Sequence, residues 1–157
     1  MDKILLVGES WISNASHFKG WDSFQSATYH VGADYLLNLF AKDKKFNIEH
    51  MPSHQASEKF PSELNHLNEY SSIIFSDIGS NTILLHPNVW IKGETFPNRL
   101  DLVKKYVENG GSFLMIGGYL SFQGINGTAR YHNTAIEDIL PVNILKYDDR
   151  IEIPQGF

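Results

Sequence analysis

The sequence predicts an α/β fold: one domain, residues 1–157, with a doubly wound, mostly parallel sheet and helices on both faces. Three observations support this prediction. The length suits a single domain with a sizeable core. Short, nearly continuous apolar runs are typical of parallel strands that are covered on both faces. Amphipathic helical patterns separate these runs, so strands and helices alternate along the chain, as they do in parallel sheets.

Four apolar runs are expected to form the strands: Ile4–Val7, Phe46–Met51, Ser72–Phe75 and Phe113–Ile116. The first, third and fourth are almost continuously apolar, as expected for parallel strands that are covered on both faces. The second is more polar and suits a strand near the edge.

Two longer segments have the spacing of amphipathic helices. In Val31–Lys44, apolar residues recur at intervals of three and four positions. Asn98–Asn109 carries one apolar stripe. Asn98 suits the N-cap position, and Gly110 supplies a left-handed stop after the last turn.

Shorter elements are expected between and after these helices. Phe60–Leu67 predicts a short helix that begins near its proline. Thr134 and Glu137 have the spacing of a capping box, which predicts a brief helix. Asn143–Lys146 and Arg150–Ile153 are expected to form weak, antiparallel final strands.

The order of elements favours right-handed crossovers and a flavodoxin-like strand order. Two connections are unusually long, Gly8–His30 and Ile78–Pro97, and they hold all three tryptophans, Trp11, Trp21 and Trp90. Exposed aromatic side chains would favour a subunit interface, so we expect a homo-oligomer. The alternative, that these connections fold back and pack on the domain, stays open.

Composition excludes several classes of function. The formal net charge is −5 and the pI about 5.7, so no basic field favours nucleic acid or an anionic membrane. The chain has no cysteine, which excludes disulfides, cysteine-ligated zinc and thiol catalysis. The first residues run into an apolar strand without the layout of a signal peptide, so the cytoplasm is the expected location.

In an open α/β sheet, ligands bind beyond the carboxyl ends of the strands. Three loops should meet there: Gly8–Trp11, Asp77–Asn81 and Gly117–Ser121. Glu9 and Asp77 are candidates for acid and base, since two nearby carboxylates can have their pKa values pushed apart. The alternative is that each carboxylate caps a helix or a backbone amide. The candidate ligand-binding residues are Gly8, Ser10, Trp11, Asn81, Gly117, Gly118, Ser121 and Arg130.

Tyr119 and His132 complete the candidate catalytic residues. Arg130 and His132 follow a glycine-rich turn, where an arginine can clamp an anion and a histidine can move protons. A structural role in that loop is the alternative. No phosphate-binding motif and no metal-ligand pattern stands in the sequence, because Pro52 separates the helically spaced His50 and His54. We therefore expect neither a cofactor nor a metal.

Eight segments carry a resemblance to a known family: 6–11, 19–24, 32–37, 76–82, 97–100, 114–122, 129–132 and 147–150. On them, the chain resembles the class I glutamine amidotransferase-like superfamily. More closely, it is similar to a branch of bacterial cytoplasmic proteins labelled "putative glutamine amidotransferases", near the trehalose-utilisation-type domains. The resemblance implies a flavodoxin-like sandwich. It also implies that members are longer, so 157 residues are either a natural short form or the amino-terminal part of a longer chain.

The resemblance further implies a nucleophilic cysteine at a sharp turn, assisted by a histidine and a glutamate from a later segment. At that turn this chain has Gly117, Gly118 and Tyr119, so glutaminase activity is not expected. A tyrosine hydroxyl, with an ordinary pKa near 10, is a poor nucleophile without strong activation.

Three hypotheses follow. The first is an amidotransferase-like domain without the thiol that binds a small polar ligand at the strand ends and oligomerises. The second is a hydrolase or isomerase of a sugar-like substrate, with Glu9 or Asp77 as acid and base. The third is a purely structural subunit.

Overall fold

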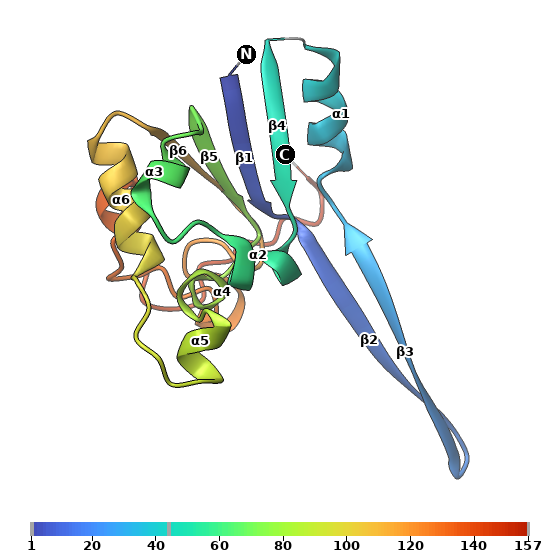
Figure 1. The fold of residues 1–157 in the computed structure, drawn as a ribbon. Helices are drawn as coiled ribbons and strands as arrows, with labels where there is room; N and C mark the ends of the chain where they lie inside the picture. Colours follow the sequence, from blue (N-terminus) through green and yellow to red (C-terminus); the bar gives the residue numbers. More distant parts are fainter. Residues whose placement is uncertain (1, 44, 157) are drawn as a thin grey trace.

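The centre of the molecule is a four-stranded parallel sheet (Figure 1). The computed structural model describes residues 2–43 and 45–156. The strand order is β4-β1-β5-β6. Numbered along the parallel strands alone, this order is 2-1-3-4, which confirms the predicted α/β fold and flavodoxin-like order. The strands are β1 (Asp2–Gly8), β4 (Phe46–Met51), β5 (Ser72–Ser76) and β6 (Ser112–Ile116). The more polar β4 lies at an edge, as expected.

The two long helices lie close to their predicted positions. α6 (Arg99–Glu108) begins at the N-cap Asn98, whose side-chain oxygen accepts from the backbone nitrogens of Leu100 and Asp101. α1 (Asp34–Lys42) is shorter than the predicted Val31–Lys44, because the chain up to Val31 belongs to a strand. The predicted end at Lys44 lies outside the described residues.

Four short helices fill the remaining connections: α2 (Ser53–Lys59), α3 (Leu64–Leu67), α4 (Ser80–Leu84) and α5 (Pro87–Trp90). The sequence analysis missed α2, whose N-cap is Pro52. It also treated Ile78–Pro97 as an open connection, whereas α4 and α5 lie within it. Within residues 2–43 and 45–156, no helix has the length and hydropathy needed to cross a membrane.

The sheet has a core on each face. On one face, Leu5, Val7, Ile73 and Phe75 belong to a cluster that includes buried residues of α2, α3, α4 and α6. On the other face, Ile4, Leu6 and Ile74 pack with apolar residues of α1. Figure 1 shows α1 beside β4 and the other helices on the opposite side of the sheet. Alternation along each strand therefore divides the side chains between two cores, as in a doubly wound fold.

A buried arginine ties three helices together. The Arg99 side chain is fully buried. Its guanidinium donates to the carbonyl oxygens of Ile83 in α4, of Ser57 in α2 and of Phe60 just after α2, at 2.5, 2.8 and 3.1 Å. Burial lowers the pKa of Arg99 to about 10, so the group still carries its charge at neutral pH. It supplies donors to carbonyls at helix ends that have no partner within the helix.

The connection Gly8–His30 is a long β-hairpin, not a loop. β2 (Ser10–Lys19) and β3 (Asp22–Val31) pair antiparallel over ten residues each and project away from the sheet (Figure 1). We call this hairpin the arm. The alternative that the connections pack on the domain is wrong for this one, where Trp11 and Trp21 are exposed by 47% and 104%. In the second connection, Ile78 and Ile83 are buried in the core, although Trp90 is 67% exposed.

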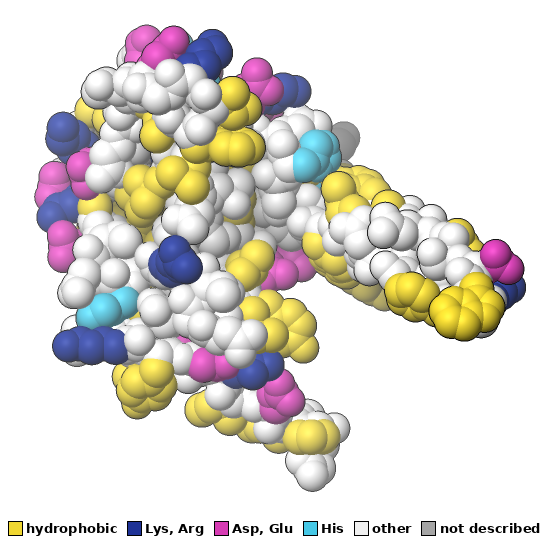
Figure 2. All heavy atoms as spheres, turned by 90° about the horizontal axis from the view of Figure 1, so that it is seen from below, with side chains coloured by type: hydrophobic (Ala, Val, Ile, Leu, Met, Phe, Trp, Pro, Cys, Tyr) yellow, Lys and Arg dark blue, Asp and Glu magenta, His cyan; other side chains and the backbone are white. Residues whose placement is uncertain are grey.

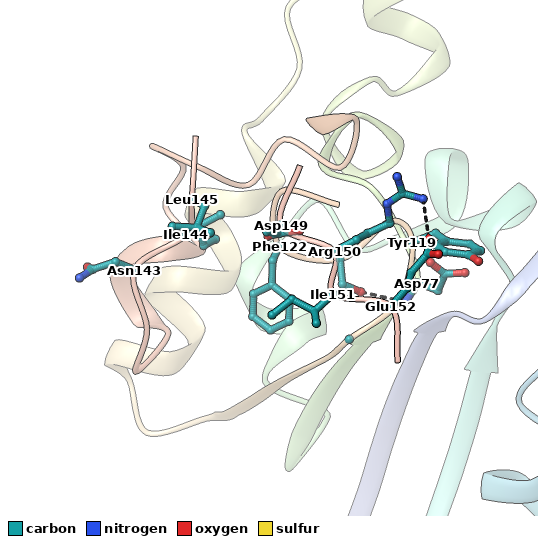
Figure 3. A pocket seen from close by; sticks show the side chains of 13 residues that line it. Asp77, Tyr119, Phe122, Asn143, Ile144, Leu145, Asp149, Arg150, Ile151 and Glu152 are labelled. Carbon is teal, nitrogen blue, oxygen red and sulfur yellow. Dashed lines mark hydrogen bonds and ion pairs between the residues drawn. The ribbon is translucent and has the colours of Figure 1, made fainter. Parts of the chain in front are cut away.

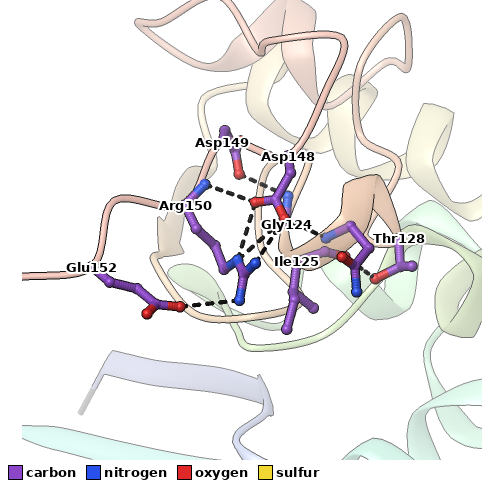
Figure 4. A network of polar contacts seen from close by, with 8 residues as sticks. Gly124, Ile125, Thr128, Asp148, Asp149, Arg150 and Glu152 are labelled. Carbon is purple, nitrogen blue, oxygen red and sulfur yellow. Dashed lines mark hydrogen bonds and ion pairs between the residues drawn. The ribbon is translucent and has the colours of Figure 1, made fainter.

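The predicted final strands are wrong. Asn143–Lys146 and Arg150–Ile153 have no regular structure. Side chains fix this segment instead. Asp149 accepts from the backbone nitrogens of Gln123 and Gly124 at 2.9 and 2.8 Å, and Figure 4 shows Asp149 beside Gly124. Asp148 accepts from Asn126 N at 2.8 Å. The two carboxylates accept hydrogen bonds from backbone amides in and beside the glycine-rich turn, residues 124–127. The final segment, residues 143–156, which we call the tail, therefore needs no strand pairing.

The expected capping box is also absent at its site. The Thr134 hydroxyl donates to the carbonyl of Tyr131 at 2.7 Å and does not act as an N-cap acceptor. The brief helix that follows is a single 3₁₀ turn, Glu137–Ile139.

Candidate functional site

Two strands end in residues with unusual backbone angles. Register pairs Gly8 at the end of β1 with Ser76 at the end of β5. The next residues, Glu9 and Asp77, both have a φ of 48°. Left-handed geometry costs a non-glycine residue about 1–3 kcal/mol and is concentrated at functional sites. The two predicted carboxylates therefore leave neighbouring strands at the same level of the sheet.

Gly8 makes this close approach possible. Its φ is 105°, and a Cβ atom at this position would lie 2.0 Å from the carbonyl oxygen of Ser76. Only glycine combines this φ with contact between the two backbones. Gly8 therefore shapes the edge of the sheet, and it does not line the cavity described below.

Asp77 is held against the turn that follows β6. Its Oδ1 accepts from the backbone nitrogen of Leu120 at 2.6 Å, and its own backbone nitrogen donates to Ser121 Oγ at 3.3 Å. Ser121 in turn donates to the carbonyl of Ile116 at 2.6 Å. A Cβ atom on Gly118 would lie 2.8 Å from Asp77 Oδ1, so the glycine leaves the space that the carboxylate fills. The carboxylate thus caps a backbone amide, which was the alternative considered for it.

Glu9 has a separate environment at the same edge. Its Oε2 accepts a short hydrogen bond from the hydroxyl of Ser76. Its backbone nitrogen donates to the carbonyl of Ser76 at 2.7 Å, and its carbonyl accepts from Gly32 at 2.9 Å. A Cβ atom on Gly32 would lie 2.5 Å from Glu9 Oε1. Glu9 and Asp77 are therefore neighbours in the fold whose side chains have different partners.

A cavity of about 630 Å³ opens beside Asp77, between the turn after β6 and the tail (Figure 3). One end is polar, with Asp77, Tyr119, Arg150 and Glu152 close together (Figure 3). The other end is apolar, with Phe122, Ile144, Leu145 and Ile151 among its lining residues. Gly117, Gly118 and Ser121 also line it, so five of the predicted site residues meet here. A cavity of this size suits a small molecule.

The polar end carries more negative than positive charge, with Arg150 against the carboxylates of Asp77, Asp149 and Glu152. Arg150 donates to Asp148 at 3.1 Å through Nε and to Glu152 at 3.1 Å through Nη1 (Figure 4). The hydrogen bond to Asp148 raises the pKa of Arg150, and the same bond lowers the pKa of Asp148 to about 2. The arginine is thus neutralised by its own neighbours. Asp77 adds a further carboxylate to the wall of the cavity.

His132 lies in a different cavity, of about 940 Å³. Its Nδ1 is 3.2 Å from Glu137 Oε2, and its Nε2 is buried without a partner among the described residues. Glu137 also accepts from the backbone nitrogens of Asn133 and Ile144 at 2.6 and 2.7 Å, and the bond from Asn133 is the main reason that its pKa is lowered. The structure does not bring His132 to Asp77.

The remaining predicted residues lie apart from the cavity beside Asp77. Ser10 and Trp11 line a small nook of about 260 Å³ at the base of the arm, with Tyr29 and His54. Arg130 and Asn81 are exposed and do not line this cavity. Across the described ranges, no group of three or more acidic, histidine or cysteine side chains is arranged to hold a metal ion.

The sequence analysis missed the contribution of the tail to the site. Asp149, Arg150 and Glu152 line the cavity, and the apolar Phe122 and Ile151 close it. The signal was the run Tyr147–Arg150, which contributed only to the family resemblance. Asp148 and Asp149 lie between the two segments that were expected to form strands, so their contact with residues 123–126 was hidden.

Comparison with known proteins identifies relatives of the whole described fold. The family model described as "Putative glutamine amidotransferase" matches residues 3–157. Two solved structures are 46% identical: Cytoplasmic Protein STM3548 from Salmonella typhimurium, with a TM-score of 0.93, and Cytoplasmic Protein STM1381 from Salmonella typhimurium LT2, with 0.92. Each match covers 98% of this chain but 62% of the other, so the chain spans less than two thirds of these relatives. No functionally curated protein matches.

Proposed function

We propose that this chain, which belongs to the family described as "Putative glutamine amidotransferase", is a domain that binds a small polar ligand beside Asp77 and has no glutaminase activity. The observation that carries the proposal is the position of Asp77. It has a left-handed backbone, lines the 630 Å³ cavity and is fixed by Leu120. A strained, preorganised carboxylate in a cavity is typical of a binding site.

The lack of glutaminase activity follows from the chemistry of the turn after β6. Hydrolysis of glutamine through a covalent intermediate needs an activated nucleophile. The turn has Gly117, Gly118 and Tyr119, and the chain has no cysteine. The space beside Gly118 is filled by the Asp77 carboxylate, which leaves no room there for a larger side chain.

The cavity favours a ligand that donates hydrogen bonds. Asp77 and Glu152 present carboxylate oxygens. Arg150, the one cation among the described residues that line the cavity, is already paired with Asp148 and Glu152. A phosphate or carboxylate would meet these negative charges, whereas hydroxyl or amino groups would be accepted. Tyr119 adds an exposed aromatic face. We therefore propose a polyol, a sugar or an amine as the ligand class.

The second candidate is an enzyme, a hydrolase or isomerase of a sugar-like substrate. It is favoured by the two carboxylates, Glu9 and Asp77, that follow paired residues of β1 and β5. In that case Glu9→Gln lowers turnover without lowering the free energy of unfolding, and Asp77→Asn does the same. Ligand binding without turnover in the wild-type protein favours the binding domain.

Two further parts of the proposal concern the surroundings of the domain. We propose that it self-associates, which is supported by the exposed aromatic side chains on the arm. We also propose a cytoplasmic location, which is supported by the names of the two similar structures.

The proposal is tested with saturation-transfer NMR on the purified protein. The panel contains monosaccharides, polyols and simple amines, with inorganic phosphate as the anionic control. We expect at least one neutral or cationic compound to bind and Asp77→Asn to weaken it about tenfold or more, as for a lost charged hydrogen bond. Asp138→Asn, on the surface, is the control. Binding of phosphate alone, or release of ammonia from glutamine, would contradict the proposal.

A further inference from the structure

The arm does not pack against the rest of the described domain along most of its length. Every residue from Trp11 to Tyr29 is solvent-exposed, although β2 and β3 are paired along their whole length. Ten residues at about 3.4 Å each give a ribbon roughly 30 Å long. An isolated two-stranded ribbon is only marginally stable in water. The arm therefore needs a surface to pack against.

Both faces of the arm carry apolar side chains, separated by polar residues such as Ser13, Asn14 and Ser26. Register places Trp11 opposite His30 and His17 opposite Phe24 on one face, and their rings are stacked. Ile12 and Tyr29 are paired on the other face, which Phe18 shares. Figure 2 shows hydrophobic side chains along the projecting arm and at its tip, where Trp21 lies.

The charge of the arm is confined to its tip. Lys19 and Asp22 are its only lysine, arginine, aspartate or glutamate residues, and they oppose each other in the register. Their charges cancel, so the arm is neutral and the net charge of −5 belongs to the rest of the chain. Two copies of an acidic protein can approach through neutral arms without strong repulsion, whereas their bodies repel.

The exposed area matches what a stable dimer requires. The aromatic side chains Trp11, Phe18, Trp21, Phe24 and Tyr29 are 46–104% exposed. Together they amount to about three whole aromatic side chains, or roughly 500–800 Å². A standard interface buries about 800 Å² on each partner. Ile12 adds further apolar surface, so one arm supplies most of one side of such an interface.

We infer that the arm is the self-association surface, and that its partner is the arm of a second copy of this chain. The two ribbons wrap around each other about a twofold axis, so that both faces of each arm contribute to the contact, and the assembly closes as a dimer. An antiparallel arrangement sets the tip residue Trp21 of each copy near the base of the other arm. This inference rests on the proposed self-association. It adds which surface makes the contact, the arm, and which symmetry relates the two copies, a twofold axis.

The first test measures molar mass by light scattering and sedimentation equilibrium at micromolar concentration. We expect twice the chain mass for the wild type and the single-chain mass for the arm variant Phe18→Ser/Trp21→Ser. The matched control Tyr35→Ser/Trp90→Ser replaces equally exposed aromatic residues outside the arm and should keep the doubled mass. A wild-type monomer overturns self-association itself. A doubled mass in the arm variant overturns only the role of the arm.

A second test does not depend on the stability of that variant. Because the chain has no cysteine, Ala15→Cys introduces a single thiol in the middle of β2. A short bis-maleimide should join two copies of Ala15→Cys into a covalent dimer. The control Ala41→Cys, exposed on α1, should stay a single chain. Equal cross-linking of both variants, or of neither, overturns the inference.

Discussion

Asp77 reaches across the edge of the sheet and accepts, through Oδ1, a 2.6 Å hydrogen bond from the backbone nitrogen of Leu120. The bond joins the end of β5 to the turn after β6. It fixes a carboxylate on the wall of the cavity and lies at the turn where the family resemblance implies a nucleophilic cysteine. Both properties that we propose for the site, binding of a polar ligand and no glutaminase chemistry, rest on this position of Asp77.

Gly118→Ala tests the fit of Asp77 in this turn. The new Cβ would lie 2.8 Å from Asp77 Oδ1, so the carboxylate must move and its bond to Leu120 weakens. Gly79→Ala is the control, because Gly79 does not line the cavity and its Cβ would lie 3.6 Å from the nearest atom, an ordinary contact. We expect Gly118→Ala to weaken binding of the panel compound about tenfold or more and Gly79→Ala to leave it unchanged, as measured by NMR titration. Equal affinities of both variants for the compound would show that Asp77 does not take part in binding.

Asp149→Ala should release the tail from the glycine-rich turn. The carboxylate accepts hydrogen bonds from the backbone nitrogens of Gln123 and Gly124. Because Gly124 is buried, its nitrogen would be left without a hydrogen-bond partner. We expect a loss of about 1–3 kcal/mol in the free energy of unfolding, measured with urea. Cleavage of the tail by a protease should also become faster. Asp138→Ala, which removes an exposed ion pair with Lys104, should cost less than about 1 kcal/mol. A tail that stays protected in Asp149→Ala would contradict this role.

The pairing of Asp148 with Arg150 predicts a loss of stability in acid. The pKa of Asp148 is lowered from 3.8 to about 2, chiefly by the hydrogen bond from Arg150. A carboxyl whose pKa is lower in the folded state stabilises the fold above its unfolded pKa and loses this contribution as the pH falls. The loss should occur between about pH 4 and pH 2.

The measurement is amide hydrogen exchange of Asn126, whose nitrogen donates to Asp148. Its protection should fall over this range in the wild type and should be low and nearly constant in Asp148→Asn. The pKa of Glu137 is also lowered, so Glu137 too loses a stabilising contribution as the pH falls, and it does so equally in the wild type and in Asp148→Asn. The same pH dependence in both proteins would rule out Asp148 as its source.

Arg99→Met should destabilise the helical layer. The substitution keeps an apolar stem but leaves the carbonyls of Ile83, Ser57 and Phe60 without this donor. Several unsatisfied buried acceptors together should cost about 3 kcal/mol or more. The exposed Arg130→Met should change the free energy of unfolding by less than about 0.5 kcal/mol. Chemical denaturation measures both values, and equal stability of the two variants would contradict the role of Arg99.

The sheet was predictable because the apolar pattern of each strand is visible within a few consecutive residues. Ile4–Val7 and Ser72–Phe75 are apolar at nearly every position, and only strands buried on both faces need that pattern. The edge position of Phe46–Met51 followed from its polar residues in the same way. The N-cap Asn98 was recognisable because capping is local in sequence.

The arm was not predictable from periodicity. Its apolar residues lie on both faces, so Ser10–Val31 shows no clean alternation, and the one local signal was the two-residue turn at Gly20 and Trp21. The tail was missed for a different reason. Its position depends on hydrogen bonds from residues 123–126 to Asp148 and Asp149, which are more than twenty residues away.

Of the site, the sequence placed Asp77, Gly117, Gly118, Tyr119 and Ser121 together, since all follow the carboxyl ends of neighbouring strands. It could not separate His132 from them, because the path of an irregular segment is set by packing. The hydroxyl of Tyr131, for example, donates to the carbonyl of Ile78 inside the core.

The most direct test of the proposed function is a ¹H–¹⁵N titration of the wild-type protein with the strongest compound of the neutral and cationic panel. If the ligand binds beside Asp77, the largest shifts will fall on the backbone amides of Gly118, Leu120 and Gly124. Shifts centred on Asn133 and Ile144, beside Glu137 and His132, or no shifts with any compound, would contradict the account.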